Sequence, residues 1–153
     1  MKRLLSFCLT VLIMLGVFSC ISFAADETIM SVEYYSDGSY GITSIKAEFT
    51  PFAAKGSKTR TKSYQHYNSD NTLAWTASIT ATFTYNGTTA SCTDVSKSTT
   101  IYDSAWKCTS SSCSKSGATA TGNFTFKRYV LLVPVQTINK TLTLTCDRNG
   151  NVT

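Results

Sequence analysis

Few residues of this chain are able to do chemistry: one histidine, nine carboxylates and six cysteines. His66 lies in a polar, basic segment, and no serine stands in a G-x-S-x-G motif. A Ser/His/Asp arrangement would need His66 with Asp70 or Asp103 as its orienting carboxylate, and a glycosidase pair would need two scattered carboxylates to meet on folding. A lone histidine in such a setting is usually a solvated surface residue. We therefore expect a protein that is not an enzyme, with a small hydrolase as the less favoured alternative.

The cysteines divide into two groups. Cys8 and Cys20 lie in the apolar N-terminal segment, whereas the rest of the chain carries an even set of four: Cys92, Cys108, Cys113 and Cys146. An even number of cysteines in an exported chain predicts two disulfides. A Cys₄ zinc site is the alternative, but such a site usually presents two close C-x₂₋₄-C pairs. The isolated positions of Cys92 and Cys146 favour disulfides, and we expect neither a metal nor a cofactor.

Four cysteines allow three pairings, and the flanking sequence favours one of them. Cys108 and Cys113 bound a short Ser/Thr segment that is typical of a loop, so they are predicted to pair as a hairpin staple. Cys92 and Cys146 each end a row of alternating apolar residues. The second predicted disulfide therefore links Cys92 to Cys146 and ties a central hairpin to the last strand.

The N-terminus has the pattern of a secretory signal peptide. Lys2 and Arg3 precede an apolar run over residues 4–18, and Ser22 and Ala24 offer the small residues that a signal peptidase reads. We expect cleavage after Ala24, which gives a signal peptide at 1–24 and one secreted domain at 25–153. The run is too short for a membrane span of about 20 residues. The alternative is a lipoprotein signal that leaves the protein lipid-anchored through Cys20.

The charge of the chain is mild. The whole sequence has 14 basic and 9 acidic residues, and loss of Lys2 and Arg3 with the signal leaves 12 basic residues and a net charge of +3. A nucleic-acid-binding protein usually shows a dense stripe of Lys and Arg and a high domain pI. We therefore expect no nucleic acid among the partners.

The clearest structural pattern lies in residues 73–92. Trp75, Ile79 and Phe83 share one face of a period-two alternation, and threonines fill the other face, which is typical of a half-buried strand. Asn86 and Gly87 then suit a two-residue type I′ turn. That turn would pair Tyr85 with Thr88 and Phe83 with Ala90. It would also place Cys92 on the inward face.

Similar patterns predict further strands along the chain. The predicted strands cover residues 29–35, 45–50, 55–67, 73–85, 88–92, 99–107, 118–127, 129–135 and 142–146. The run 129–135 is apolar throughout, which is typical of a strand covered on both sides or of a crossing between sheets. From these patterns we expect an all-β fold of about seven or eight strands. A single antiparallel β-sandwich, with immunoglobulin-like or Greek-key topology possible, is favoured over a closed barrel.

The one basic cluster lies within residues 55–67. It places Lys58, Arg60 and Lys62 on one side of a strand, with Tyr64 continuing that side and Tyr67 nearby. One interpretation is an edge strand whose charges discourage pairing with other chains. The other is a binding site formed by these five residues, because tyrosines beside cations suit exposed recognition surfaces. The partner would be a cell-wall or host glycan, or an acidic protein surface.

Several motifs carry a resemblance to a known group. They are Trp75, TATFTYNG at 80–87, Cys92, residues 100–102 with Trp106, and LTLTCD at 142–147 followed by Asn149-Gly150-Asn151. This combination resembles small exported β-sandwich-like proteins of Gram-positive bacteria with no assigned activity, and it implies no functional residues. Export and the absence of a recognisable catalytic motif lead us to expect a secreted, non-catalytic interaction domain. A secreted effector, toxin or inhibitor is the alternative.

Overall fold

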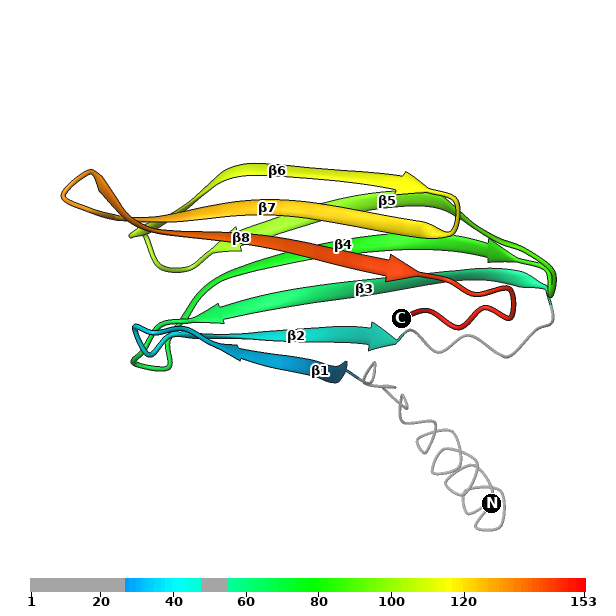
Figure 1. Cartoon of the computed structure of the whole chain (residues 1–153), viewed down its shortest axis with the longest axis horizontal. Coiled ribbons are helices and arrows are strands. Elements are labelled where there is room, and N and C mark those ends of the chain that lie inside the picture. Colours follow the sequence, from blue (N-terminus) through cyan, green and yellow to red (C-terminus); the bar gives the residue numbers. More distant parts are fainter. Residues whose placement is uncertain (1–26, 48–54) are drawn as a thin grey trace, which may run out of the picture.

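The structure, a computed structural model, describes residues 27–47 and 55–153, so the predicted signal peptide lies outside the described residues. The described part of the chain is all β and contains no helix long and apolar enough to cross a membrane. Its eight antiparallel strands are β1 (Glu27–Tyr34), β2 (Tyr40–Ala47), β3 (Gly56–Tyr67), β4 (Leu73–Tyr85), β5 (Ala90–Ile101), β6 (Trp106–Ser116), β7 (Thr119–Val130) and β8 (Val133–Thr145). Figure 1 shows all of them.

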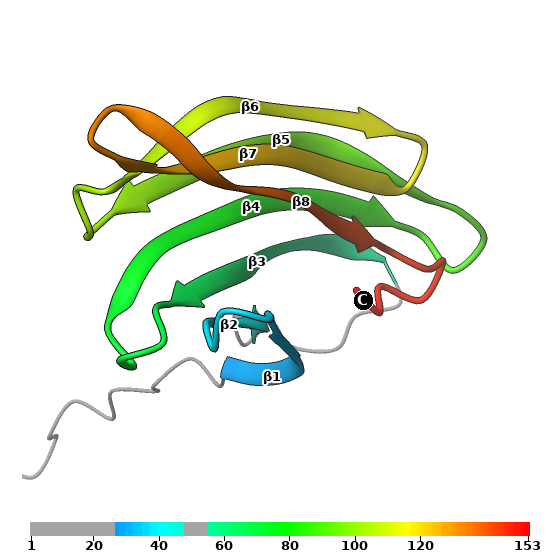
Figure 2. The same cartoon turned by 60° about the vertical axis from the view of Figure 1, so that its left-hand side comes forward.

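The strands form two layers, which confirms the predicted β-sandwich. One sheet has the order β1-β2-β3-β4-β5, and the other has the order β6-β7-β8. Each sheet is therefore a meander in sequence order, so the immunoglobulin-like and Greek-key topologies are wrong. In Figures 1 and 2 the three-stranded sheet covers β3 to β5, while β1 and β2 continue beyond its edge.

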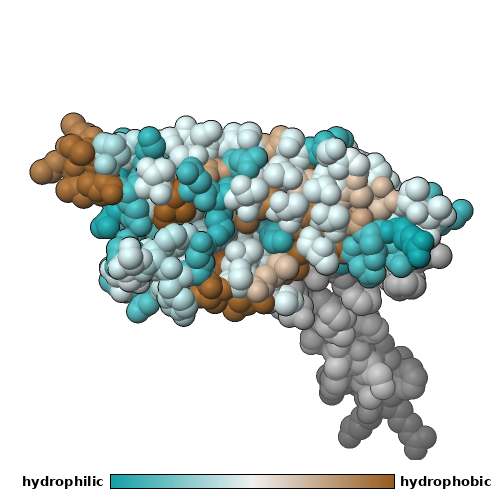
Figure 3. Space-filling view, viewed as in Figure 1, coloured by the Kyte–Doolittle hydropathy of each residue, from teal (hydrophilic) through white to brown (hydrophobic). Residues whose placement is uncertain are grey.

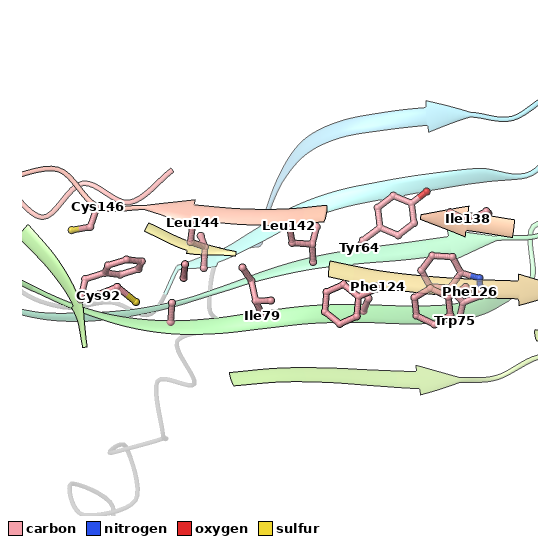
Figure 4. Packing of buried hydrophobic residues seen from close by; sticks show 14 of the residues in the cluster. Tyr64, Trp75, Ile79, Cys92, Phe124, Phe126, Ile138, Leu142, Leu144 and Cys146 are labelled. Carbon is pink, nitrogen blue, oxygen red and sulfur yellow. The ribbon is translucent and has the colours of Figure 1, made fainter. Parts of the chain in front are cut away.

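Strand β4 carries the predicted central pattern and supplies much of the core. The side chains of Trp75, Ile79 and Phe83 are fully buried, as the alternation predicts. Trp75 stacks on Phe126 of the other sheet, with ring centroids 3.6 Å apart and planes 10° apart. Figure 4 shows the aromatic and aliphatic residues of both sheets gathered between the layers. Burial of each large apolar side chain stabilises the fold by about 2–3 kcal/mol.

The β4–β5 hairpin differs from its predicted register by two residues. Tyr85 pairs with Ala90, and Phe83 pairs with Cys92, so the loop contains four residues where two were predicted. The Asn86 side chain explains the longer loop, because its Oδ1 accepts hydrogen bonds from the backbone N–H groups of Thr88 and Thr89 at 2.9 and 2.8 Å. A shift of two residues keeps every side chain on its face. Cys92 therefore still faces the core, as predicted.

The single predicted strand over 99–107 is wrong, because the irregularity expected at Asp103-Ser104 is a full turn between two strands. Strand β5 runs on to Ile101, and β6 begins only at Trp106. Asp103 forms the turn: its carboxylate accepts a hydrogen bond from the Ala105 N–H at 2.9 Å, and its carbonyl accepts one from the Trp106 N–H at 3.0 Å. The large apolar residues of the predicted strand, Ile101 and Trp106, consequently belong to different sheets.

The predicted Ser-rich loop is also wrong, and with it the Cys108–Cys113 disulfide. Both cysteines lie within the single strand β6. Five residues of extended strand separate their Cα atoms by roughly 16 Å, far more than the roughly 7 Å that a disulfide tolerates. Hydroxyl-bearing residues mimic a loop in composition, but here they are strand residues paired with β7.

The Cys92–Cys146 disulfide is not present either. Both cysteines are buried at the same end of the core, but their thiols are free. The Cys92 thiol donates to the carbonyl of Asp94 at 3.3 Å, and the Cys146 thiol donates to the carbonyl of Asp147 at 3.4 Å. Burial raises the pKa of both thiols, so they are held in the protonated form.

The apolar run 129–135 is a hairpin tip, not a strand covered on both sides. Leu131 and Leu132 form the two-residue turn between β7 and β8, and their side chains are 92% and 90% exposed. Their φ angles of +47° and +70° are in the left-handed region, which costs about 1–2 kcal/mol per residue other than glycine. The tip forms the brown projection at one end of the molecule in Figure 3.

Candidate functional site

The predicted basic strip (Lys58, Arg60, Lys62, Tyr64 and Tyr67) belongs to a strand in the interior of the five-stranded sheet, and its three cations are half-buried. Strand β3 pairs with β2 on one side and β4 on the other, so the edge-strand interpretation of this segment is wrong. Lys58 donates through Nζ to the carbonyl of Gly150 at 2.8 Å, and Lys62 donates through Nζ to the carbonyl of Thr143 at 2.9 Å. Both lysines thus connect β3 to the C-terminal part of the chain. Burial lowers the pKa of Lys62.

The other residues of the strip are also engaged. The half-buried Arg60 donates through its guanidinium to the carbonyl of Thr59 at 2.9 Å. Tyr64 is fully buried, its hydroxyl lies 2.8 Å from that of Tyr35, and the Lys140 Nζ sits 4.2 Å from the centroid of its ring. Among the five predicted binding residues, Tyr64 cannot touch a ligand without a rearrangement of the core.

His66 is a core residue rather than the predicted solvated one. Its ring stacks on Trp75 and meets Trp106 edge-on, with 5.0 Å between centroids in each case. Burial lowers its pKa to about 4. Within the described residues neither ring nitrogen has a hydrogen-bond partner. The Asp70 carboxylate accepts from the Thr72 N–H, and the Asp103 carboxylate accepts from the Ala105 N–H and the Asn68 side chain. The candidate Ser/His/Asp arrangement is therefore not assembled.

Five tyrosines of the first three strands and their turn divide between the two faces of the five-stranded sheet. Tyr35 and Tyr64 face the other layer, whereas Tyr34, Tyr40 and Tyr67 face outward. Tyr40 pairs with both Tyr34 and Tyr67 across neighbouring strands. The Tyr40 and Tyr67 rings are stacked, with centroids 4.9 Å apart and planes 7° apart, and the Tyr34 ring follows at 6.0 Å from Tyr40. We call Tyr34, Tyr40 and Tyr67 the tyrosine ladder.

Local sequence explains how the ladder is positioned. Asp37 and Gly38 form the turn between β1 and β2, with Gly38 at φ +82°. The Asp37 carboxylate accepts hydrogen bonds from the Ser39 hydroxyl and N–H at 2.6 and 3.0 Å, and the hydroxyl bond is the main cause of its lowered pKa. This turn sets Tyr34 directly opposite Tyr40. The regular register of β2 with β3 then places Tyr67 opposite Tyr40 and completes the row.

The ladder is an uncharged surface with one open aromatic ring. Tyr34 at its end is 80% exposed. The same outer face of β3 and β4 continues with threonine hydroxyls that pair across the strands, Thr59 with Thr82 at 2.9 Å and Thr61 with Thr80 at 2.8 Å. The surface therefore combines apolar ring faces with groups that both donate and accept hydrogen bonds.

Only Tyr67 of the ladder belongs to the predicted binding residues. The sequence does indicate a turn at Asp37-Gly38, and Tyr34 and Tyr40 each lie three residues from Asp37. This equal spacing was the signal that could have predicted that the two rings lie side by side. The third ring could not be found this way, because the pairing of β2 with β3 crosses residues 48–54, whose length does not fix a register.

The described residues contain no group of three or more histidine, cysteine or acidic side chains able to hold a metal ion. Comparison of the chain with protein-family models, curated proteins and solved structures finds no match. The resemblance to exported Gram-positive proteins therefore stays a prediction, and the site must be interpreted from its own chemistry.

Proposed function

We propose that the protein acts outside the cell as a non-catalytic interaction domain whose tyrosine ladder binds a glycan. The observation that carries this proposal is the row of three tyrosine rings on the outer face, in which Tyr40 and Tyr67 are stacked and the 80% exposed Tyr34 ends the row with its ring tilted by 39° against Tyr40. The signal-like pattern in residues 1–24 supports export.

A glycan suits this surface better than an acidic protein. A sugar ring presents an apolar C–H face that can lie on an aromatic ring, and a rim of hydroxyls that hydrogen-bond to polar neighbours. Tyr34 offers the aromatic face, and the tyrosine hydroxyls and the Gln65 amide beside Tyr67 offer hydrogen-bonding groups at the same end of the sheet. The threonine hydroxyls of β3 and β4 lie farther along the same outer face. Lys58 and Lys62, the cations expected to attract an acidic partner, are instead bonded to backbone carbonyls of the same chain.

Rigid rings favour binding of a flexible chain molecule. Tyrosine has few rotatable bonds, and stacking already orders the Tyr40 and Tyr67 rings before any ligand arrives. Less conformational entropy is therefore lost on binding. An elongated ligand could follow the row across the ends of β1, β2 and β3.

Affinity electrophoresis through gels that contain neutral or acidic polysaccharides tests the proposal. The wild-type chain at 25–153 should be retarded by at least one polysaccharide, and Tyr34→Ser should abolish most of this retardation. Tyr102→Ser is the matched control, because Tyr102 is 59% exposed and follows β5 at the opposite edge of the sheet. Equal retardation of the wild type and Tyr34→Ser, or no retardation of the wild type, would contradict the proposal.

A further inference from the structure

We propose that the tip of the β7–β8 hairpin, residues 130–135, docks on a lipid bilayer with anionic headgroups by shallow insertion of its apolar side chains. This inference goes beyond the glycan-binding proposal and does not depend on it. It rests on three features of the hairpin: the exposure of its apolar residues, its backbone conformation, and the cations behind it.

The tip is the most apolar exposed part of the described chain. Leu131 and Leu132 are almost fully exposed, and the flanking valines at positions 130, 133 and 135 are at least half exposed. No charged residue occurs from Tyr129 to Val135. In Figure 1 the hairpin projects beyond the neighbouring turns, and in Figure 3 the same end is the largest brown region of that face. Apolar patches of this kind mark protein or membrane contacts.

The backbone of the tip shows that folding does not explain its leucines. A two-residue hairpin turn with positive φ at both positions favours Asn-Gly, because these residues tolerate the left-handed region. Leu131 and Leu132 adopt that conformation although leucine resists it, and their side chains pack against nothing in the core. A local departure from turn preference with no benefit to the fold points to a contact outside the chain.

Cations lie directly behind the apolar tip. Lys107 and Lys127 are directly opposite each other on β6 and β7, an arrangement of like charges that destabilises a sheet. Neither these lysines nor Arg128 forms a salt bridge with a described residue. The Lys107 Nζ lies 5.2 Å from the centroid of the Tyr129 ring. An anionic surface would relieve the repulsion.

The order of these residues along the hairpin matches the layers of a bilayer. Apolar side chains come first, then the aromatic ring of Tyr129, and then the cations at 127 and 128. Aromatic residues favour the membrane interface, and cations favour the phosphate level. One residue pair, Val130 with Val133, lies between the turn and Tyr129, so Tyr129 is two residues from Leu131, a length of roughly 7 Å. This length falls within the roughly 5–10 Å to which interfacial elements insert.

A second copy of the chain is a weaker candidate for the same patch. Two tips that meet would bring two sets of Lys107, Lys127 and Arg128 close together, and the repulsion would oppose association. Anionic headgroups supply the opposite charge and the apolar phase together.

Vesicle co-sedimentation of residues 25–153 tests this inference, because this part contains all eight strands and lacks the apolar N-terminal run. A cooperative thermal transition first confirms that each variant is folded. The wild type should bind vesicles of phosphatidylcholine with phosphatidylglycerol at low salt, and more weakly without phosphatidylglycerol. The variant Leu131→Asn/Leu132→Gly installs the preferred turn, so it should unfold at the same or a higher temperature and lose at least tenfold in vesicle binding.

Three further variants complete the test. Lys107→Gln/Lys127→Gln should weaken binding to the anionic vesicles by about tenfold, because each cation near such a surface contributes about fivefold before screening by salt. Ile29→Thr removes an exposed apolar residue of β1, an edge strand of the other sheet, and it should bind like the wild type. Val133→Thr/Val135→Thr preserves side-chain shape and repeats the test if the turn variant does not fold.

Three results would overturn the inference. The first is a wild type that binds neither vesicle composition. The second is a folded turn variant that binds as well as the wild type. The third is a wild type that does not bind vesicles but forms concentration-dependent dimers by light scattering, with no dimers for the turn variant. That result would identify a second copy of the chain as the partner.

Discussion

The Cγ2 methyl of Ile79 occupies the space where a side chain at Gly122 would begin. A Cβ atom added at Gly122 would lie 2.2 Å from this methyl group, and the ring of Phe124 closes another side of the space at 3.1 Å. Strands β4 and β7 therefore approach each other more closely here than side chains on both would allow. The absence of a side chain on β7 lets the two sheets pack around Ile79.

Replacing Gly122 by Ala should accordingly destabilise the protein by about 1–3 kcal/mol, because overpacking forces the neighbouring atoms to shift. Chemical denaturation of the wild type and the variant measures the difference. In an Ile79→Ala background the same substitution should cost much less, because the clashing methyl group is gone. Equal costs in the two backgrounds would show that the contact between Gly122 and Ile79 is not the cause.

His66 should make the stability depend on pH. Its pKa of about 4 in the folded protein lies below the value of about 6.5 expected when the chain is unfolded. Burial is the main cause and outweighs the nearby Asp37 and Glu33 charges, which raise the pKa, while Arg128 lowers it further. At pH 7 both states are largely neutral, and below pH about 6.5 only the unfolded chain takes up the proton.

The free energy of unfolding should therefore fall as the pH drops from about 6.5 to about 4, by at most about 3 kcal/mol from this residue. Denaturation curves across this range measure the slope. His66→Phe keeps an aromatic ring and removes two buried nitrogens that lack partners among the described residues. This variant should lose the part of the slope that His66 causes. If the slope of His66→Phe equals that of the wild type, His66 is not the cause of the pH dependence.

The free thiols should differ in reactivity. Cys108 and Cys113 are partly exposed, whereas Cys92 and Cys146 are buried with raised pKa values. Iodoacetamide should therefore label Cys108 and Cys113 in the native protein, and Cys92 and Cys146 only after denaturation. Mass spectrometry of peptides identifies the labelled positions. A covalent link between Cys108 and Cys113 would contradict the continuous strand β6.

The sequence was most informative where burial and strand period coincide. In β4 the alternation of Trp75, Ile79 and Phe83 with threonines predicted both the strand and its inward face, because only one face of that strand meets an apolar layer. The inward position of Cys92 was predicted correctly although the hairpin register was wrong by two residues, because a shift of two residues keeps each side chain on its face.

Prediction failed where composition imitates another structure. The serines between Cys108 and Cys113 are typical of a loop, yet they pair with β7 as strand residues. The apolar run 129–135 is typical of a buried strand, yet its centre is a turn held by two leucines with positive φ. Neither feature follows from local preference, because such a turn favours Asn-Gly over leucine and serine is more typical of turns than of strands.

The candidate site was only partly predictable, because it depends on which strands become neighbours. The basic strip has the alternation of an exposed strand face, and only the position of β3 inside the sheet, with β8 across from it, shows that Lys58 and Lys62 point inward. The tyrosine ladder likewise requires the registers of β1 with β2 and of β2 with β3. A single sequence does not fix these registers.

The most direct test of the account is a calorimetric titration of residues 25–153 with a soluble oligosaccharide of the polysaccharide that retards the protein most. Tyr34→Ser should raise Kd by about tenfold, since stacking on an aromatic ring is worth roughly 0.5–1.5 kcal/mol and its burial adds to this. Tyr34→Phe should stay within about threefold of the wild type because the ring is kept. Lys62→Met, which alters the interior strip, should leave Kd unchanged. A Kd for Tyr34→Ser equal to that of the wild type, or a loss with Lys62→Met as large as that with Tyr34→Ser, would contradict binding through the tyrosine ladder.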